Sequence, residues 1–240
     1  MASPRLFRTR QNAGRELGFA LRAYEAASPL VLGIPPGGVP VAFEVARALG
    51  APLDVWAASK VRVPLEPELG IGAVAEGDEV FLDLAMVAAL RASRLQIDAL
   101  VAKTRDEVAD QRRRLEMGRE RPVVRGKTVI LVDDGVATGN TAPAALRALK
   151  RCGAQKRILA LPVAAYDVFQ SLRNEADDLV CLEKVANLEA VGLWYHDAFS
   201  CSDEDVIGLL QQAHELADGS WRGQPAFDAF DNRLEPGSRR

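Results

Sequence analysis

The sequence predicts an α/β fold in which a central parallel sheet carries helices on both faces. Short continuous apolar runs at residues 30–34, 129–132 and 158–164 are typical of strands buried on both faces. Each run is followed by a turn and then by a segment with helical periodicity. This alternation predicts parallel strands joined by right-handed crossovers.

The N-terminal half is expected to contain three strands. Ala13, Leu17, Leu21 and Tyr24 share one face of a first helix. The elements expected after it are a strand at 30–34, a PPGG turn, a helix at 41–49, a strand at 53–59 and a strand at 71–75. The polar, proline-bearing segment between the last two strands, residues 60–69, is tethered at both ends and is expected to act as a lid.

A helical excursion is expected over residues 84–118. Its later part places a thin stripe on one face, made of Ile97, Val101, Thr104, Val108, Gln111 and Leu115. We expect this stripe to rest along the body or against a second subunit, which would form a homodimer. Arg112, Arg113 and Arg114 lie among acidic residues, so they indicate a solvated mixed-charge face and not a nucleic-acid contact.

The C-terminal half continues the alternation. The expected elements are a strand at 129–132, a helix at 141–150, a strand at 158–164, a helix at 166–175, a strand at 179–182, a last strand at 190–193 and a closing helix at 203–217. We therefore expect one domain over residues 1–218. Residues 219–240 are rich in Gly, Pro and charge, which predicts a disordered tail.

Composition excludes several classes of protein. The chain has 240 residues, 48% of them hydrophobic, and a net charge of −3, which gives no general attraction to nucleic acid or to an anionic membrane. No apolar run approaches the roughly 20 residues of a membrane span, and the N-terminus lacks the apolar core of a secretory signal. The three cysteines lie far apart, which predicts neither a zinc site nor a disulfide framework. We expect a cytoplasmic protein.

The most specific motif is VILVDDGVATGNTA at residues 129–142. Two acids after a buried strand can accept hydrogen bonds from vicinal hydroxyls, and the glycines that follow let backbone N–H groups converge on an anion. The helix from Thr141 would aim its positive end at the same anion. A nucleotide triphosphate loop needs a lysine after the last glycine, where this chain has Asn140. A simple helix cap would explain the acids alone, but not the whole run.

This run resembles the ribose-phosphate binding signature of the type I phosphoribosyltransferase family. Similar segments, GIPPGGVPVAFEVA at 33–46, Lys60, PELGIGAV at 67–74 and VGLWYHDAF at 191–199, extend the resemblance over most of residues 5–217. It implies a type I phosphoribosyltransferase-like fold with a lid and a donor, phosphoribosyl pyrophosphate, chelated by Mg²⁺. The ion would be held mainly through substrate oxygens and not by a direct protein site.

The resemblance also implies roles for particular residues. Asp133 and Asp134 would take the ribose hydroxyls, and Lys60 would approach the diphosphate; these three form the expected catalytic set. The expected donor-binding residues are Pro36, Gly37, Gly38 and Val39 for the diphosphate and Gly135, Val136, Ala137, Thr138, Gly139, Asn140 and Thr141 for the 5′-phosphate.

The acceptor end is less defined. Trp194 and Tyr195 could stack on a heterocycle, or they could pack in the core or rim. Related enzymes that act on 6-oxopurines carry an acid where this chain has Ala137, which makes that subclass a poor fit. The predicted activity is transfer of a phosphoribosyl group to a small nitrogenous acceptor with release of pyrophosphate, in nucleotide metabolism.

Two departures favour an alternative. The similar proteins carry basic residues where this chain has Pro36 and Ser59, although Arg62 is close enough in sequence to replace one of them. A charged contact to phosphate contributes about 1.5–3 kcal/mol, so two losses would weaken catalysis more than donor binding. The alternative is a non-catalytic regulatory protein that binds phosphoribosyl pyrophosphate or a nucleotide.

Overall fold

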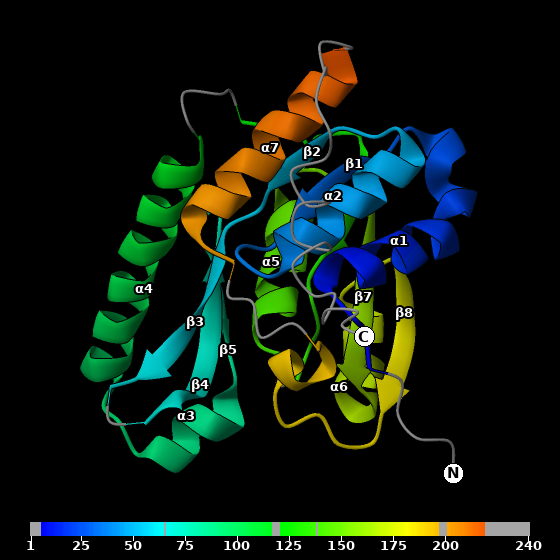
Figure 1. The fold of residues 1–240 in the computed structure, drawn as a ribbon. Helices are drawn as coiled ribbons and strands as arrows, with labels where there is room; N and C mark the ends of the chain where they lie inside the picture. The colour runs from blue at the N-terminus through cyan, green and yellow to red at the C-terminus, as the bar shows by residue number, and fades with distance from the viewer. Residues whose placement is uncertain (1–5, 65, 117–120, 138, 197–200, 219–240) are drawn as a thin grey trace, which may run out of the picture.

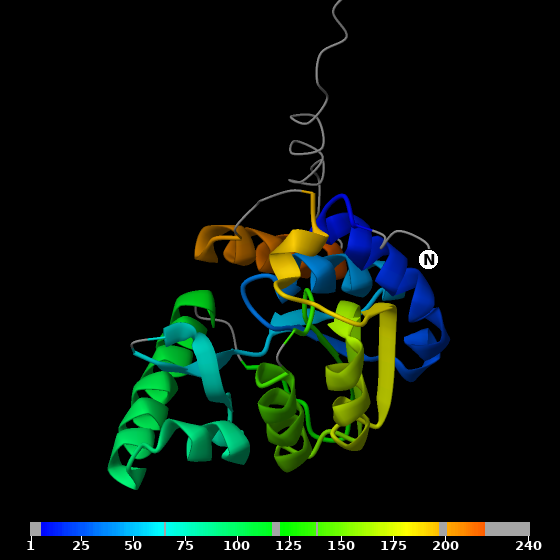
Figure 2. The same ribbon diagram turned by 90° about the horizontal axis from the view of Figure 1, so that it is seen from below.

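The computed structural model describes residues 6–64, 66–116, 121–137, 139–196 and 201–218. Two sheets lie side by side, a five-stranded parallel sheet and a three-stranded antiparallel sheet (Figures 1 and 2). The predicted α/β architecture is confirmed. The predicted tail at 219–240 lies outside the described residues and stays a prediction.

The parallel sheet has the strand order β2-β1-β6-β7-β8. Its strands are β1 (Leu30–Gly33), β2 (Leu53–Val55), β6 (Thr128–Val132), β7 (Lys156–Ala165) and β8 (Asp178–Val185). β1 and β6 pair in register, with Leu32 opposite Leu131. Because both strands run the same way, the turns that follow them meet at one edge of the sheet.

Helices cover both faces of this sheet, as predicted (Figure 2). Since side chains alternate along a strand, Val31 and Ile130 pack with α1 (Arg10–Ala20) and α2 (Gly38–Leu49) in one buried cluster. Leu32 and Leu131 pack on the other face, in a cluster that includes α5 (Thr141–Arg151) and α6 (Tyr166–Ser171). α7 (Asp203–Asp218) closes against α2.

The segment expected to act as a lid, residues 60–69, belongs to the antiparallel sheet, which contains β3 (Ala58–Val63), β4 (Glu66–Ala75) and β5 (Glu79–Leu82) and is called the lid sheet below. The prediction of a single strand at 53–59 is wrong, because the chain changes sheets there. The Trp56 amide donates to Gly33 O in the parallel sheet, whereas Ala57 O accepts from the Glu76 amide at the end of β4. The predicted strand at 71–75 is the second half of β4.

The helical excursion consists of two helices, α3 (Leu84–Leu90) and α4 (Arg94–Glu116). The chain breaks at Arg91, which has a φ of 50°, and Ser93 and Gln96 then cap each other at the start of α4. α4 packs along β3 and β4 of the lid sheet in the same chain (Figure 1).

The structure contradicts one residue of the predicted α4 stripe, Gln111. Arg112 is 2% exposed and takes the place expected for Gln111, which lines the crevice described below. The interpretation of Arg112 as part of a solvated face is therefore also wrong, whereas Arg113 is exposed as expected. The reason is that Arg112 meets two acids that are distant in sequence, Asp54 of β2 and Glu76, which follows β4.

The predicted strand at 190–193 is also wrong. This segment is a single 3₁₀ turn, η3 (Val191–Trp194), that packs on the N-terminal segment and on Val163. Val191 and Trp194 are three residues apart, a spacing that a 3₁₀ turn places on one side. Two further 3₁₀ turns, η1 (Arg22–Ala27) and η2 (Leu172–Asn174), extend α1 and α6. Within the described part of the chain, every helix is too short or too polar to cross a membrane.

Candidate functional site

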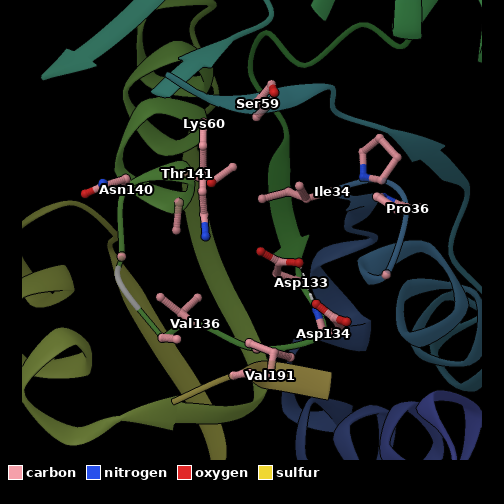
Figure 3. A pocket seen from close by; sticks show the side chains of 18 of the residues that line it. Ile34, Pro36, Ser59, Lys60, Asp133, Asp134, Val136, Asn140, Thr141 and Val191 are labelled. Carbon is pink, nitrogen blue, oxygen red and sulfur yellow. Dashed lines mark hydrogen bonds between the residues drawn. The ribbon is translucent and has the colours of Figure 1, made fainter. Parts of the chain in front are cut away.

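A crevice of about 730 Å³ opens where β1 and β6 end and faces the lid sheet (Figure 3). Four segments line it: the PPGG turn at 35–38 after β1, the acidic turn at 133–134 after β6, the phosphate turn at 135–141 and strand β3 of the lid. Segments far apart in sequence thus meet at the carboxyl edge of the parallel sheet, where folds of this kind bind ligands.

Asp133 and Asp134 lie next to each other but point in different directions (Figure 3). Asp133 faces the part of the crevice that holds Lys60, whereas Asp134 lies nearer the PPGG turn. The Asp134 amide donates to Asp133 Oδ1 at 2.9 Å, which fixes the first carboxylate against the backbone. The two acids therefore present separate oxygen atoms to separate parts of the crevice.

Burial raises the pKa of Asp133 well above its usual range, and the neighbouring Asp134 raises it further. The ammonium of Lys60 acts in the opposite direction and lowers this pKa. The carboxyl oxygens of Asp133 can accept hydrogen bonds from sugar hydroxyls.

Asp134 forms an ion pair that the sequence did not predict. Arg10 Nε donates to Asp134 Oδ2 at 2.8 Å, and Arg10 Nη2 lies 2.7 Å from the same oxygen. Arg10 begins α1 and lines the crevice. The sequence did hold a signal, because a basic residue at the positive end of a helix with no acid in its first turn is unfavourable without a partner.

The phosphate turn needs its two glycines. A Cβ at Gly135 would lie 2.8 Å from Val163 Cγ1, and Gly139 has a φ of 75° with Val168 Cγ1 2.5 Å from the place of a Cβ. Both glycines and Val136, Ala137, Asn140 and Thr141 line the crevice, as predicted. Thr138 lies outside the described residues.

Two residues of this turn also have structural contacts. The Val136 amide donates to Val163 O at 3.1 Å, so this N–H bonds to β7 and not to a ligand. Asn140 Nδ2 donates to Gly70 O at 2.9 Å, which ties the phosphate turn to strand β4 of the lid. The first residue of α5, Thr141, lines the same crevice.

Part of the backbone of the PPGG turn forms hydrogen bonds within the turn itself. Pro36 and Gly37 line the crevice, but the Gly38 amide donates back to Ile34 O at 2.9 Å and the Val39 amide to Pro36 O at 3.3 Å. Val39 is fully buried. Gly38 and Val39, expected among the donor-binding residues, therefore differ from that expectation: neither lines the crevice, and both amides close the turn.

Lysine and arginine side chains enter from the lid. Lys60 and Arg62, both on β3, line the crevice, and Lys60 extends toward Asp133 (Figure 3). Ser59 lines it as well and, like Pro36, brings no charge. The expectation that Arg62 faces the site agrees with this arrangement.

Trp194 and Tyr195 are 8% and 5% exposed and pack with Phe7 and Leu188. Neither lines the crevice, so the structure contradicts the prediction that they stack on a ligand and supports their packing role. Tyr195 Oη donates to the backbone oxygen of Asp134 at 2.5 Å. Glu189, Ala190, Val191 and Cys201 also line the crevice, and the sequence did not single them out.

Comparisons with known proteins agree with this geometry. A family model described as the phosphoribosyl transferase domain matches residues 10–194. Rv0571c of Mycobacterium tuberculosis, provisionally named a phosphoribosyl transferase, is 39% identical over 210 residues. That alignment covers 88% of this chain and 47% of the relative, so the chain spans about half the length of the curated relatives it matches.

The fold is also similar to solved structures. The crystal structure of TT1426 from Thermus thermophilus is 38% identical, covers 85% of this chain and 97% of that one, and superposes with a TM-score of 0.71. On the family model, the identity and the shared fold, the chain belongs to the phosphoribosyl transferase domain family.

Proposed function

We propose that this protein transfers a phosphoribosyl group from phosphoribosyl pyrophosphate to a small nitrogenous acceptor and releases pyrophosphate. One observation supports this most strongly: the acidic turn, the phosphate turn and the PPGG turn open onto one crevice that Lys60 enters from the lid. Their order matches the parts of the donor, with the 5′-phosphate at residues 135–141, the ribose at Asp133 and Asp134, and the diphosphate between the PPGG turn and Lys60.

The residues of the crevice suit the charge changes of this reaction. Positive charge develops at the anomeric carbon as the bond to pyrophosphate breaks, and the departing group gains negative charge. Asp133 and Asp134 lie on the ribose side, where they favour the positive centre. Lys60 and Arg62 lie on the lid, where they favour the leaving group.

Mg²⁺ is part of the proposal. Within the described residues no group of three or more His, Cys, Asp or Glu side chains could hold a metal by itself. Two carboxylates in a crevice fit an ion that takes most of its ligands from substrate phosphates, which is how Mg²⁺ often binds. The ion would be held mainly by substrate oxygens, beside Asp133 and Asp134, and it would neutralise part of the diphosphate charge.

The acceptor enters at the end lined by Glu189, Ala190 and Val191. Ala137 also lines the crevice, so the carboxylate that enzymes acting on 6-oxopurines carry at that position is replaced here by a methyl group. We therefore propose another nitrogenous acceptor. We place the reaction in the cytoplasm as part of nucleotide metabolism.

The test combines binding and turnover. Calorimetry with Mg²⁺ and phosphoribosyl pyrophosphate should show binding that is lost in the double variant Asp133→Asn/Asp134→Asn, and a panel of nucleobases and amines should reveal one that releases pyrophosphate. Absence of donor binding to the folded wild-type protein would refute the proposal.

The second candidate is a non-catalytic regulatory protein that binds the same donor or a nucleotide. Pro36 and Ser59 favour it, because both line the crevice without a charge. Tight binding, no turnover across the panel and no gain of turnover in Pro36→Arg/Ser59→Arg would support this candidate over the enzyme.

A further inference from the structure

Arg10 differs from the other basic residues of the crevice in its origin. Lys60 and Arg62 come from β3 of the lid, whereas Arg10 is the first residue of α1 and lies 124 residues before its partner Asp134. Its side chain is 14% exposed, so the charge lies mostly out of water. Removing an arginine from water is costly, and a paired carboxylate offsets that cost.

Arg10 and Gly37 of the PPGG turn both lie close to one atom, Oδ2 of Asp134. Both guanidinium contacts go to Asp134 Oδ2, and a Cβ added at Gly37 would lie 2.3 Å from that oxygen. The guanidinium therefore sits at the end of the crevice that the PPGG turn forms. The side chains that this turn itself brings to the crevice are those of Pro35 and Pro36, which carry no charge.

Tyr195 also fixes the orientation of Arg10. Its guanidinium lies over the ring of Tyr195, 4.6 Å from the centroid, and the Tyr195 hydroxyl donates to the backbone oxygen of Asp134. The Phe7 ring stacks on the same tyrosine, and the Phe7 amide and carbonyl bond to Trp194 O and the His196 amide. Tyr195, which itself stacks on Phe7, thus holds Arg10 beside Asp134.

From these contacts we infer that Arg10 is a donor-site residue: it holds Asp134 against the PPGG turn and supplies positive charge to the diphosphate end of the crevice. The inference rests on the proposed function and extends it to a residue outside the turns and the lid. It also gives Tyr195 a role, which is to support this arginine.

Two probes separate the ends of the donor. Inorganic pyrophosphate should bind between the PPGG turn and Lys60, whereas ribose 5-phosphate should bind mainly at residues 135–141. We expect Arg10→Gln to weaken binding of pyrophosphate with Mg²⁺ by roughly tenfold to a hundredfold in calorimetry. Binding of ribose 5-phosphate should weaken much less. A merely structural role would weaken both probes equally.

Arg22→Gln is the matched control, because it removes the same charge from an exposed position after α1 and should leave both affinities unchanged. Arg10→Lys keeps the charge and should bind pyrophosphate more tightly than Arg10→Gln. Melting temperatures verify that each variant is folded.

The outcomes are distinct. If the wild-type protein binds both probes and Arg10→Gln binds pyrophosphate as tightly, or loses both probes to the same extent, this inference is overturned and the proposed function stands. If the folded wild-type protein binds neither probe, the proposed function fails and this inference fails with it.

Discussion

Two arginines in this fold are withdrawn from water and paired with acids from distant segments, but they lie in different places. Arg112 is 2% exposed and meets Asp54 of β2 and Glu76, which follows β4, where the parallel sheet and the lid sheet join. Arg10 is 14% exposed and meets Asp134 at the rim of the crevice. Both contacts join segments that the sequence separates by dozens of residues.

The surroundings of the two arginines assign them different roles. Arg112 also donates to Val55 O and lies 3.9 Å from Glu116, so acids and backbone surround it. These acids balance its positive charge, and its contacts join the lid sheet to the parallel sheet. Arg10 lines the crevice beside a turn that brings no charge, where a ligand can meet it. Burial alone therefore does not separate a structural arginine from a functional one; the neighbouring space does.

The largest expected effect tests the structural role of Arg112. Arg112→Ala should lower the free energy of unfolding by about 3–5 kcal/mol, because it leaves Asp54 and Glu76 without their partner. Urea denaturation measures this loss. Arg113→Ala, at the exposed neighbouring position, is the control and should cost less than about 1 kcal/mol. Equal losses of stability in Arg112→Ala and Arg113→Ala would show that the buried pairs of Arg112 contribute no more than an exposed arginine does.

The next effect concerns pH at the same junction. Burial raises the pKa of Glu76 from 4.5 to about 7, against the opposing effect of Arg112. Because the folded state binds the proton more tightly, the contribution of Glu76 to stability is greatest below pH 4.5 and falls as the pH rises to 7. Glu76→Gln should lack this fall.

The size of the difference follows from linkage. Between pH 4.5 and 7 the wild-type protein should lose about 3 kcal/mol more of its unfolding free energy than Glu76→Gln does. Urea denaturation at a series of pH values gives both curves. Parallel curves would show that Glu76 titrates normally and that the junction is more hydrated than its contacts indicate.

The smallest expected effect tests the role of the Arg10–Asp134 pair in donor binding. Gly37 has an ordinary helical φ of −68°, so Gly37→Ala introduces no backbone strain, but its Cβ would press on Asp134 Oδ2 and disturb the pair with Arg10. We expect the affinity for phosphoribosyl pyrophosphate to fall about tenfold in calorimetry, which is about 1.4 kcal/mol.

Gly208→Ala provides the matched control, because no atom lies within 4 Å of its added Cβ. It should leave the donor affinity unchanged. An unchanged affinity in Gly37→Ala as well would indicate that the position of Asp134 does not matter for binding, and would weaken the functional assignment of Arg10.

Local patterns predicted the parts of the site that are continuous in the chain. The acidic turn and the phosphate turn follow directly from a buried strand at 128–132, and the glycines lie where the backbone approaches β7 and α6. Lys60 was expected from the family resemblance, and it lies on β3 of the lid sheet. The two turns could be predicted because their residues are consecutive in the sequence.

The sequence by itself determined the α/β class, the strand that carries Asp133 and Asp134, and the position of the lid, because strand and helix periods and glycine turns act over a few residues. The tertiary structure decided the pairing of Arg10 with Asp134, the burial of Arg112 and the packing of Trp194 and Tyr195 away from the crevice. The physical reason is that a charge or an aromatic ring takes its role from partners brought near by folding, and those partners lie far away along the chain.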